Sequence, residues 1–213
     1  MPAPTAIHVC SACGYETARW AGQCPGCGEW NTLLEETRRE PPRGAARRRS
    51  APTKPVELGA IRPEREQRLS TGVSELDSVL GGGIVPGSLV LIGGAPGIGK
   101  STLTTMALAN LAGAGRRTLY ISAEESAAQI RLRAERLLEP AALAIPVIAD
   151  TDLHVVLATL ERERPDVCVI DSVQTLRSNE LSSAAGSVAQ VREVAGEIMR
   201  VAKALRIAVL LVG

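Results

Sequence analysis

The feature that most constrains this chain is the glycine-rich segment GAPGIGKS at residues 94–101. It matches the pattern G-x-x-x-x-G-K-[ST] in full, with an apolar run before it and helix-forming residues after it. Glycines let backbone N–H groups turn inward around phosphate oxygens, and the start of the following helix adds partial positive charge. The sequence therefore predicts a nucleotide-binding P-loop, in preference to a glycine-rich turn without a ligand.

The residues of this segment are expected to bind different parts of ATP and its metal ion. We expect Lys100 to reach the β- and γ-phosphates and the hydroxyl of Ser101 to ligate Mg²⁺. Thr102 follows near the α-phosphate. The expected nucleotide-binding residues are Gly93, Gly94, Ala95, Pro96, Gly97, Ile98, Gly99, Lys100, Ser101 and Thr102.

Acidic residues follow two other apolar runs. The run at residues 167–170 ends in Asp171, which we expect at the carboxyl edge of a parallel sheet, acting on Mg²⁺ mostly through a water. Glu124 and Glu125 follow the run at residues 119–122. From position alone, these two acids fit a water-orienting role and a helix N-terminal charge role equally well. Cys168, inside the first run, is interpreted as a small buried hydrophobic residue.

The order of apolar and helical segments predicts the fold class. Strands are expected at Ser88–Gly93, Thr118–Ser122, Ile145–Ala149, Val167–Asp171 and Ile207–Val212. Helices are expected at Lys100–Ala112, Ser126–Leu138, Leu153–Glu163 and Ser187–Leu205. Such alternation indicates parallel βαβ units, so we expect an α/β fold with a P-loop core and a mostly parallel sheet. With no Phe in the chain, two Tyr and two Trp, the core must be aliphatic, which suits a sheet covered on both faces.

Four of the five cysteines lie in two C-x-x-C pairs near the amino terminus. The pairs are separated by ten residues and consist of Cys10, Cys13, Cys24 and Cys27. Two knuckles of this kind bring four thiolates into a tetrahedron, which suits a structural Zn²⁺ ion. A redox dithiol pair and an iron–sulfur cluster are the alternatives. His8 would be a fifth ligand and is left out of the predicted set.

Composition divides the chain into three parts. We expect a four-cysteine zinc module at residues 1–34, a basic Pro/Arg-rich linker at 35–57, and an incomplete P-loop core at 58–213. The linker contains six arginines and almost no large apolar residue, so it is interpreted as a flexible tether. An accessory contact with nucleic acid phosphates is the alternative interpretation of its arginines.

Charge and hydropathy exclude some function classes. The net charge of +1 argues against a uniformly basic nucleic-acid-binding surface. No apolar run approaches the length of a membrane span, and no secretory signal pattern is found, so we expect a cytoplasmic protein without a membrane partner.

The order of the motifs resembles one known family. The cysteine module is followed in turn by Arg68-Leu69-Ser70-Thr71-Gly72, the run Gly81-Gly82-Gly83, the P-loop, and Tyr120-Ile121-Ser122-Ala123-Glu124-Glu125-Ser126. Asp171-Ser172-Val173-Gln174-Thr175 and Gly186-Ser187-Val188-Ala189-Gln190 come last. Over all but the linker, this order resembles RadA (Sms), a bacterial family of RecA-like DNA repair ATPases.

The resemblance implies a function and a set of partners. Members of such a family are expected to be DNA-dependent ATPases that form hexameric rings, process recombination intermediates and promote branch migration alongside RecA. Single-stranded and branched DNA, RecA and other recombination proteins are the implied partners. The resemblance also favours Glu124 as the catalytic glutamate, with Lys100 and Asp171. It places Arg177 and Arg192 near a DNA channel, although Arg192 fits a solvated helix charge equally well.

The chain also departs from the family pattern. Ala95, Ala123 and Ala185 replace residues that are usually different in relatives, and none of these changes removes a catalytic group. The resemblance implies a longer protein, with a Lys-Asn-Arg-Phe-Gly motif and a Lon-protease-like domain after residue 213. Two other functions stay open: a RecA-like ring ATPase of the KaiC kind that serves protein partners, and a P-loop nucleoside or nucleotide kinase.

Overall fold

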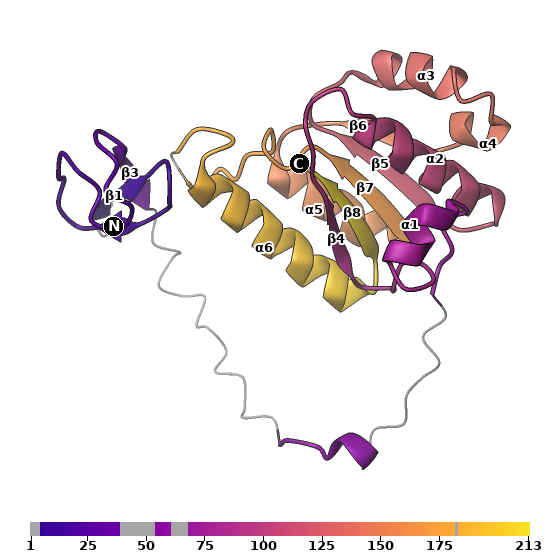
Figure 1. Ribbon diagram of the computed structural model, residues 1–213, viewed down its shortest axis with the longest axis horizontal. Helices are drawn as coiled ribbons and strands as arrows, with labels where there is room; N and C mark the ends of the chain where they lie inside the picture. Colours follow the sequence, from indigo (N-terminus) through magenta and orange to yellow (C-terminus); the bar gives the residue numbers. More distant parts are fainter. Residues whose placement is uncertain (1–4, 39–53, 61–67, 182) are drawn as a thin grey trace.

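A computed structural model describes residues 5–38, 54–60, 68–181 and 183–213 of the chain. It contains a small antiparallel sheet near the amino terminus and a larger parallel sheet flanked by helices (Figure 1). The linker arginines at 39–49 lie outside the described residues. No helix of the described segments is long and apolar enough to cross a membrane.

The amino-terminal sheet has three short strands. They are β1 (Thr5–Cys10), β2 (Glu16–Thr17) and β3 (Leu33–Arg38), in the order β2-β1-β3. All pairs are antiparallel, with Cys10 opposite Leu33 at the end of the β1–β3 ladder. The hydrophobic cluster of this part contains only Cys10, Cys24 and Leu33 as buried members. An apolar core of this size cannot stabilise the module, so its fold depends on what the cysteines bind.

The larger sheet has five parallel strands in the order β4-β8-β7-β5-β6. They are β4 (Leu89–Ile92), β5 (Thr118–Ser122), β6 (Val147–Ala149), β7 (Val167–Asp171) and β8 (Ala208–Val212). The connecting helices are α2 (Lys100–Gly113), α3 (Ala127–Glu135), α4 (Pro140–Leu143), α5 (Leu153–Glu163) and α6 (Val188–Leu205). The three inner strands β5, β7 and β8 are buried along their whole length. This arrangement confirms the α/β fold with a parallel sheet that the alternating pattern predicts, and it agrees with the RecA-like core that the resemblance implies.

Side-chain alternation along the strands creates two cores. Val167 and Val169 of β7 face the cluster that contains residues of α2, α3 and α4, whereas Cys168 and Ile170 face the cluster that contains residues of α5 and α6. Cys168 is fully buried, and burial raises the pKa of its thiol. The interpretation of Cys168 as a small hydrophobic core residue is therefore confirmed.

Several element boundaries differ from those expected. A helix α1 (Ser74–Val79), a 3₁₀ turn η1 (Leu58–Ala60) and α4 were not expected. Helix α3 ends at Glu135 and not at Leu138, because Leu138 has φ +54° and the chain turns there before Pro140 starts α4. The third strand begins at Val147 and not at Ile145.

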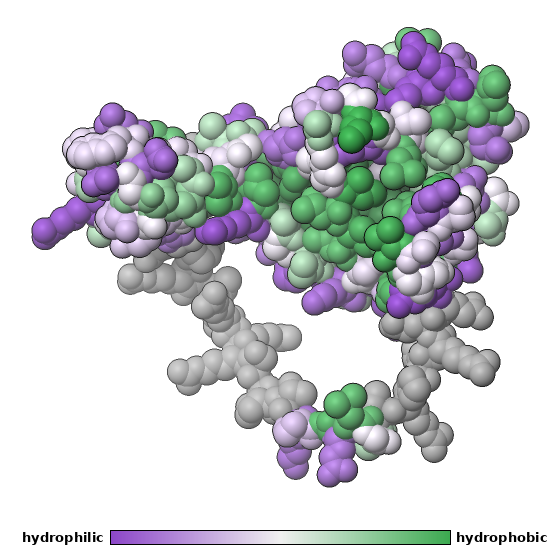
Figure 2. Space-filling view, viewed as in Figure 1, coloured by the Kyte–Doolittle hydropathy of each residue, from purple (hydrophilic) through white to green (hydrophobic). Residues whose placement is uncertain are grey.

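Strand β4 forms one edge of the large sheet. Figure 2 shows apolar side chains gathered over this side of the molecule, and Leu91 of β4 is 66% exposed. Isolated exposed leucines are ordinary, but an exposed leucine on an edge strand marks a sheet edge that no described residue covers.

Candidate functional site: the carboxyl edge of the parallel sheet

The P-loop connects the end of β4 to the start of α2. Gly97 and Gly99 adopt φ +78° and +100°, a left-handed conformation that favours glycine. No side-chain hydrogen bond caps α2 at Gly99, so the N–H groups of its first turn face the loop. Such uncapped N–H groups and the helix dipole together form a binding site for phosphate oxygens.

Lys100 is the first residue of α2, and its side chain folds back over the loop. Its Nζ atom donates hydrogen bonds to the carbonyl oxygens of Gly94 at 2.7 Å and Ala95 at 3.2 Å. Ser101 and Thr102 are half-buried in the same turn. The segment thus brings an ammonium group, a hydroxyl group and a ring of backbone N–H groups together at one sheet edge.

Asp171 ends β7 at the same edge, with strand β8 between it and β4. Its side chain is only 6% exposed, and its Oδ2 atom accepts a hydrogen bond of 2.7 Å from the hydroxyl of Tyr120. The carboxylate is therefore held by the strand beside it and still lies at the carboxyl end of the sheet, where ligands bind in open α/β folds.

The two glutamates after β5 have different partners. The hydroxyl of Ser172, next to Asp171, donates a short hydrogen bond to Oε1 of Glu124. The carboxylate of Glu125 instead forms an ion pair of 2.5 Å with Arg133 of α3. Glu124 therefore lies beside the end of β7, whereas Glu125 is turned toward α3.

Three residues of this edge were missed by the sequence reasoning. Ser172, Tyr120 and Arg133 contact the acids directly. Ser172 and Tyr120 belong to segments that carry the family resemblance, but none of the three was assigned a role in the site. The sequence contained one signal for Tyr120: it is the only aromatic residue after position 30. A lone hydroxyl-bearing aromatic in an otherwise aliphatic core needs a polar partner.

The four predicted zinc ligands lie together in the amino-terminal module. Their Sγ atoms all lie within 4.8 Å of one another, with Cys10–Cys27 and Cys13–Cys24 separations of 3.7 Å. A tetrahedral Zn²⁺ ion with Zn–S bonds of about 2.3 Å requires S–S separations of about 3.8 Å. The donor set therefore fits one zinc ion. His8 does not belong to this cluster.

The thiol of Cys10 ionises more readily than an ordinary cysteine thiol. Burial opposes the ionisation of Cys10, but hydrogen bonds with the side chain of Thr32 and with the backbone of Cys13 and Ala12 outweigh it and lower its pKa to about 6. The thiolate is the form that binds a metal ion.

The two arginines expected near DNA are both exposed. Arg177 follows β7, and its backbone bonds to that of Thr151 and Leu153. Arg192 lies on α6, where a Cβ atom added to Gly14 would meet its Nη1 atom at 2.7 Å. The first knuckle of the cysteine module therefore lies against the amino-terminal part of α6.

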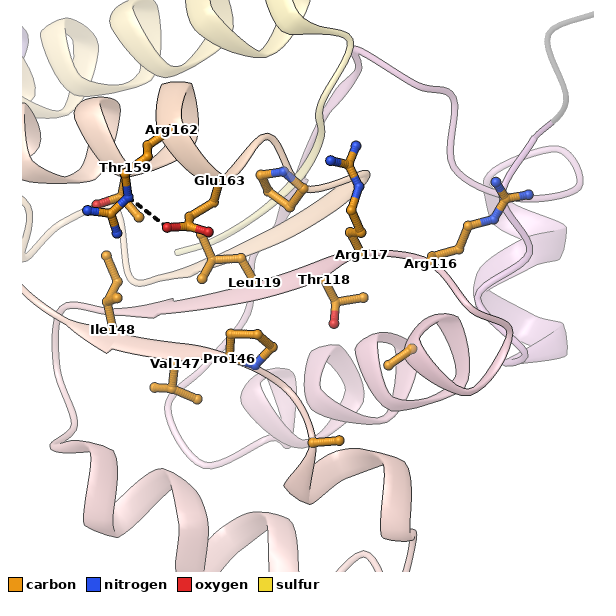
Figure 3. A pocket seen from close by; sticks show the side chains of 13 residues that line it. Arg116, Arg117, Thr118, Leu119, Pro146, Val147, Ile148, Thr159, Arg162 and Glu163 are labelled. Carbon is orange, nitrogen blue, oxygen red and sulfur yellow. Dashed lines mark hydrogen bonds and ion pairs between the residues drawn. The ribbon is translucent and has the colours of Figure 1, made fainter.

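A cavity of about 550 Å³ lies away from all these groups. Figure 3 shows it beside Arg117 and Thr118, where β5 starts, and beside Thr159 and Glu163 of α5. Arg117 and Thr118 lie at the amino end of β5, opposite to the P-loop edge of the sheet, and Arg162 and Glu163 at the cavity form an ion pair of 2.7 Å. The cavity contains none of the predicted site residues, so it is not the nucleotide site.

Comparison with known proteins agrees with this arrangement. Residues 8–35 match the model of a rubredoxin metal binding domain, and residues 69–138, which include the P-loop, match the KaiC ATPase family. The DNA repair protein RadA of Listeria monocytogenes is 47% identical over 98% of this chain and 46% of its own length. The RadA proteins of Bacillus subtilis and Pseudomonas aeruginosa are 44% and 45% identical over 96% and 97% of the chain.

The chain spans about half the length of these curated relatives. The similarity nevertheless covers both the cysteine module and the parallel sheet with its P-loop. The chain is therefore a homologue of the RadA proteins with a KaiC-like ATPase domain.

Proposed function

We propose that this chain forms the zinc-binding and ATP-binding part of a DNA-dependent ATPase of recombinational DNA repair. One observation carries the proposal: a complete P-loop, Asp171 and Glu124 lie at one sheet edge in a chain 47% identical to a protein named DNA repair protein RadA. The finer activity, the processing of recombination intermediates and branch migration alongside RecA, follows from the family resemblance.

In the proposed site, the loop N–H groups from Gly94 to Gly99 bind the phosphates of ATP. Lys100 exchanges its contacts with Gly94 and Ala95 for the β- and γ-phosphates. Ser101 and Asp171 are the residues that would hold Mg²⁺, Asp171 mostly through a water. The bound ion would neutralise the charge that develops on the phosphoryl oxygens.

Glu124 is the proposed group that orients the attacking water. Its carboxylate lies beside Ser172 at the end of β7, on the same side as Asp171. Glu125 is the poorer candidate, because an ion pair with Arg133 engages its carboxylate. The different partners of the two acids therefore favour Glu124. Their positions in the sequence alone do not distinguish them.

The cysteine module is proposed to hold one structural Zn²⁺ ion through Cys10, Cys13, Cys24 and Cys27. Four thiolates complete a tetrahedral shell and leave no position for a substrate. The ion would therefore stabilise the fold of the module and take no part in ATP hydrolysis.

The proposed partners are single-stranded and branched DNA, RecA and other recombination proteins, and further copies of the chain in a hexameric ring. Arg177 and Arg192 are the proposed DNA-contacting residues, since both are exposed and lie on the segments that follow β7. A cytoplasmic location goes with a DNA substrate in a bacterial cell.

The proposal is tested by ATP turnover with and without single-stranded DNA. The assay uses this chain, its Lys100→Ala variant, and the longer Listeria monocytogenes relative. We expect DNA to accelerate turnover by the relative, and the Lys100→Ala change to abolish ATP binding by the chain. Turnover by the relative that no DNA affects would favour the KaiC-like alternative, and phosphate transfer to a nucleoside would favour the kinase alternative.

A further inference from the structure

Tyr120 lies in the middle of β5 and is 1% exposed, surrounded by an otherwise aliphatic sheet. A phenylalanine would fill the same space without carrying a polar atom into the core. A buried hydroxyl group stabilises the fold only when it is hydrogen-bonded. The partner of Tyr120 is a proposed magnesium ligand, Asp171, whose Oδ2 atom lies 2.7 Å from the hydroxyl oxygen.

Arg133 of α3 fixes the direction of this hydrogen bond. Its Nη2 atom donates to the hydroxyl oxygen of Tyr120 at 2.8 Å, and its guanidinium carbon lies 5.8 Å from the centre of the tyrosine ring. Because the oxygen accepts from Arg133, the tyrosine proton points to Asp171.

The same guanidinium group also binds the carboxylate of Glu125. Its Nη1 atom donates to Oε2 of Glu125 at 2.5 Å, and the arginine side chain is only 18% exposed. The planar fork of an arginine can hold two acceptors at a fixed angle, which a lysine cannot. Arg133 therefore links α3, Glu125, Tyr120 and Asp171 in one continuous chain of hydrogen bonds.

We propose that Tyr120 and Arg133 are positioning residues of the ATP site. Tyr120 engages Oδ2 of Asp171, which leaves Oδ1 as the atom that would hold a water on Mg²⁺. Among the described residues, no hydrogen bond uses that Oδ1 atom. Arg133 holds Glu125 on the α3 side, which leaves Glu124 as the acid beside the phosphates.

The positioning role of Tyr120 and Arg133 rests on the proposed ATP-binding function, so the test distinguishes a failure of the positioning role from a failure of ATP binding. The affinity of the chain for a fluorescent ATP analogue is measured with Mg²⁺ and with EDTA. Tyr120→Phe removes one oxygen atom and keeps the ring. We expect its affinity in EDTA to match that of the unmodified chain, because the P-loop is untouched. The gain in affinity that Mg²⁺ provides is expected to fall by about tenfold, the size of one lost hydrogen bond to a charged group.

Tyr15→Phe is the matched control, since it makes the same chemical change in the cysteine module and is expected to leave both affinities unchanged. Arg133→Gln is expected to reduce the Mg²⁺-dependent gain in the same way as Tyr120→Phe. An unchanged gain in Tyr120→Phe would overturn the proposal. An equal loss of affinity in Mg²⁺ and EDTA would also overturn it, because that pattern indicates a packing role.

A failure of the proposed ATP-binding function has a different signature. In that case the unmodified chain does not bind the analogue in EDTA or in Mg²⁺, or Lys100→Ala binds it equally well. Thermal unfolding of each variant is followed in parallel, so that a folding defect is recognised by a lowered midpoint.

Discussion

Removal of zinc should unfold the cysteine module and leave the ATPase domain folded. The apolar part of the module consists of Val9 and Leu33 with two of its cysteines, Cys10 and Cys24. Full burial of an aliphatic side chain contributes about 1.5–3 kcal/mol, so Val9 and Leu33 cannot offset the conformational entropy of more than 30 ordered residues. The bound ion must supply the difference.

The size of the metal contribution follows from the donor set. Four thiolates with S–S separations of 3.7 Å in two pairs fit a Zn²⁺ ion without rearrangement. Structural zinc sites in small domains contribute about 10–16 kcal/mol at pH 7, which corresponds to dissociation constants of about 10⁻⁷ to 10⁻¹² M. We expect one zinc ion per chain with an affinity in this range.

The chain offers an internal probe for this prediction. Its only two tryptophans, Trp20 and Trp30, both lie in the module and pack over Gly22, at 3.9 and 3.6 Å from a Cβ added there. Because the two side chains are already 61% and 66% exposed, we expect their fluorescence anisotropy to fall, with little change in emission wavelength, when a strong chelator removes the ion. The helical circular dichroism, which arises almost entirely from the ATPase domain, should change little.

Two variants make the assay decisive. Cys24→Ser removes one ligand and should abolish zinc binding at micromolar concentrations, whereas Cys168→Ala, in the core of the large sheet, should retain one zinc per chain. The reasoning is refuted if the tryptophan signal is the same with and without zinc. It is also refuted if the purified chain contains iron and sulfide.

Three further predictions concern the ATPase domain. Ser126→Ala removes the capping box of α3, in which the side chains of Ser126 and Gln129 accept hydrogen bonds from each other's backbone N–H groups. The change should lower the free energy of unfolding in urea by about 0.5–2 kcal/mol. An unchanged urea midpoint would contradict this prediction. Burial opposes the ionisation of Asp77, but hydrogen bonds from Ser70 and Thr71 lower the pKa of its carboxyl group. The ionised carboxylate therefore stabilises the fold above the unfolded-state pKa of about 3.9. This stabilisation is lost as the pH falls through the lower folded-state pKa. Asp77→Asn should therefore flatten the loss of stability below pH 4 in acid titrations, and an identical acid profile would argue against this account. Glu124→Gln should reduce ATP turnover about 100-fold or more at unchanged ATP affinity, whereas Glu125→Gln should have a smaller effect; the opposite order would exchange their roles.

The sequence was sufficient to locate the carboxyl ends of the strands to within one residue. Strand-end reasoning predicted that the P-loop and Asp171 would lie at one edge of the sheet, and the structure has both there. This succeeds because parallel strands joined by helices must present their carboxyl ends together. The four-cysteine cluster was equally accessible, since the spacing of two knuckles determines that their sulfurs meet.

The partners of the acids could not be predicted from the sequence. Whether the hydroxyl of Tyr120 reaches Asp171 depends on the pairing of β5 with β7, which aligns Tyr120 with Val169 and Ser122 with Asp171. Arg133 reaches Glu125 and Tyr120 from α3, which begins two residues after Glu125. Contacts of this kind are tertiary and leave no local pattern.

Short helices were missed for a different reason. Helix α1 spans six residues and α4 spans four, too few for a clear 3.6-residue periodicity. Helix α1 is held by the hydrogen bonds of Asp77 with Ser70 and Thr71, and Asn110 of α2 donates a bond of 2.9 Å to the carbonyl oxygen of Thr71. Thr71, which holds Asp77 of this helix, is thus anchored in turn by a residue 39 positions further along the chain.

The measurement that tests the central claim most directly is a crystal structure of this chain with Mg²⁺ and a non-hydrolysable ATP analogue. The account predicts β- and γ-phosphates on the N–H groups of the P-loop. It also predicts Lys100 Nζ on the phosphates in place of the carbonyl oxygens of Gly94 and Ala95, and Mg²⁺ between Ser101 and the water held by Asp171. A nucleotide in the cavity beside Arg117, with Lys100 still bonded to Gly94, would contradict it.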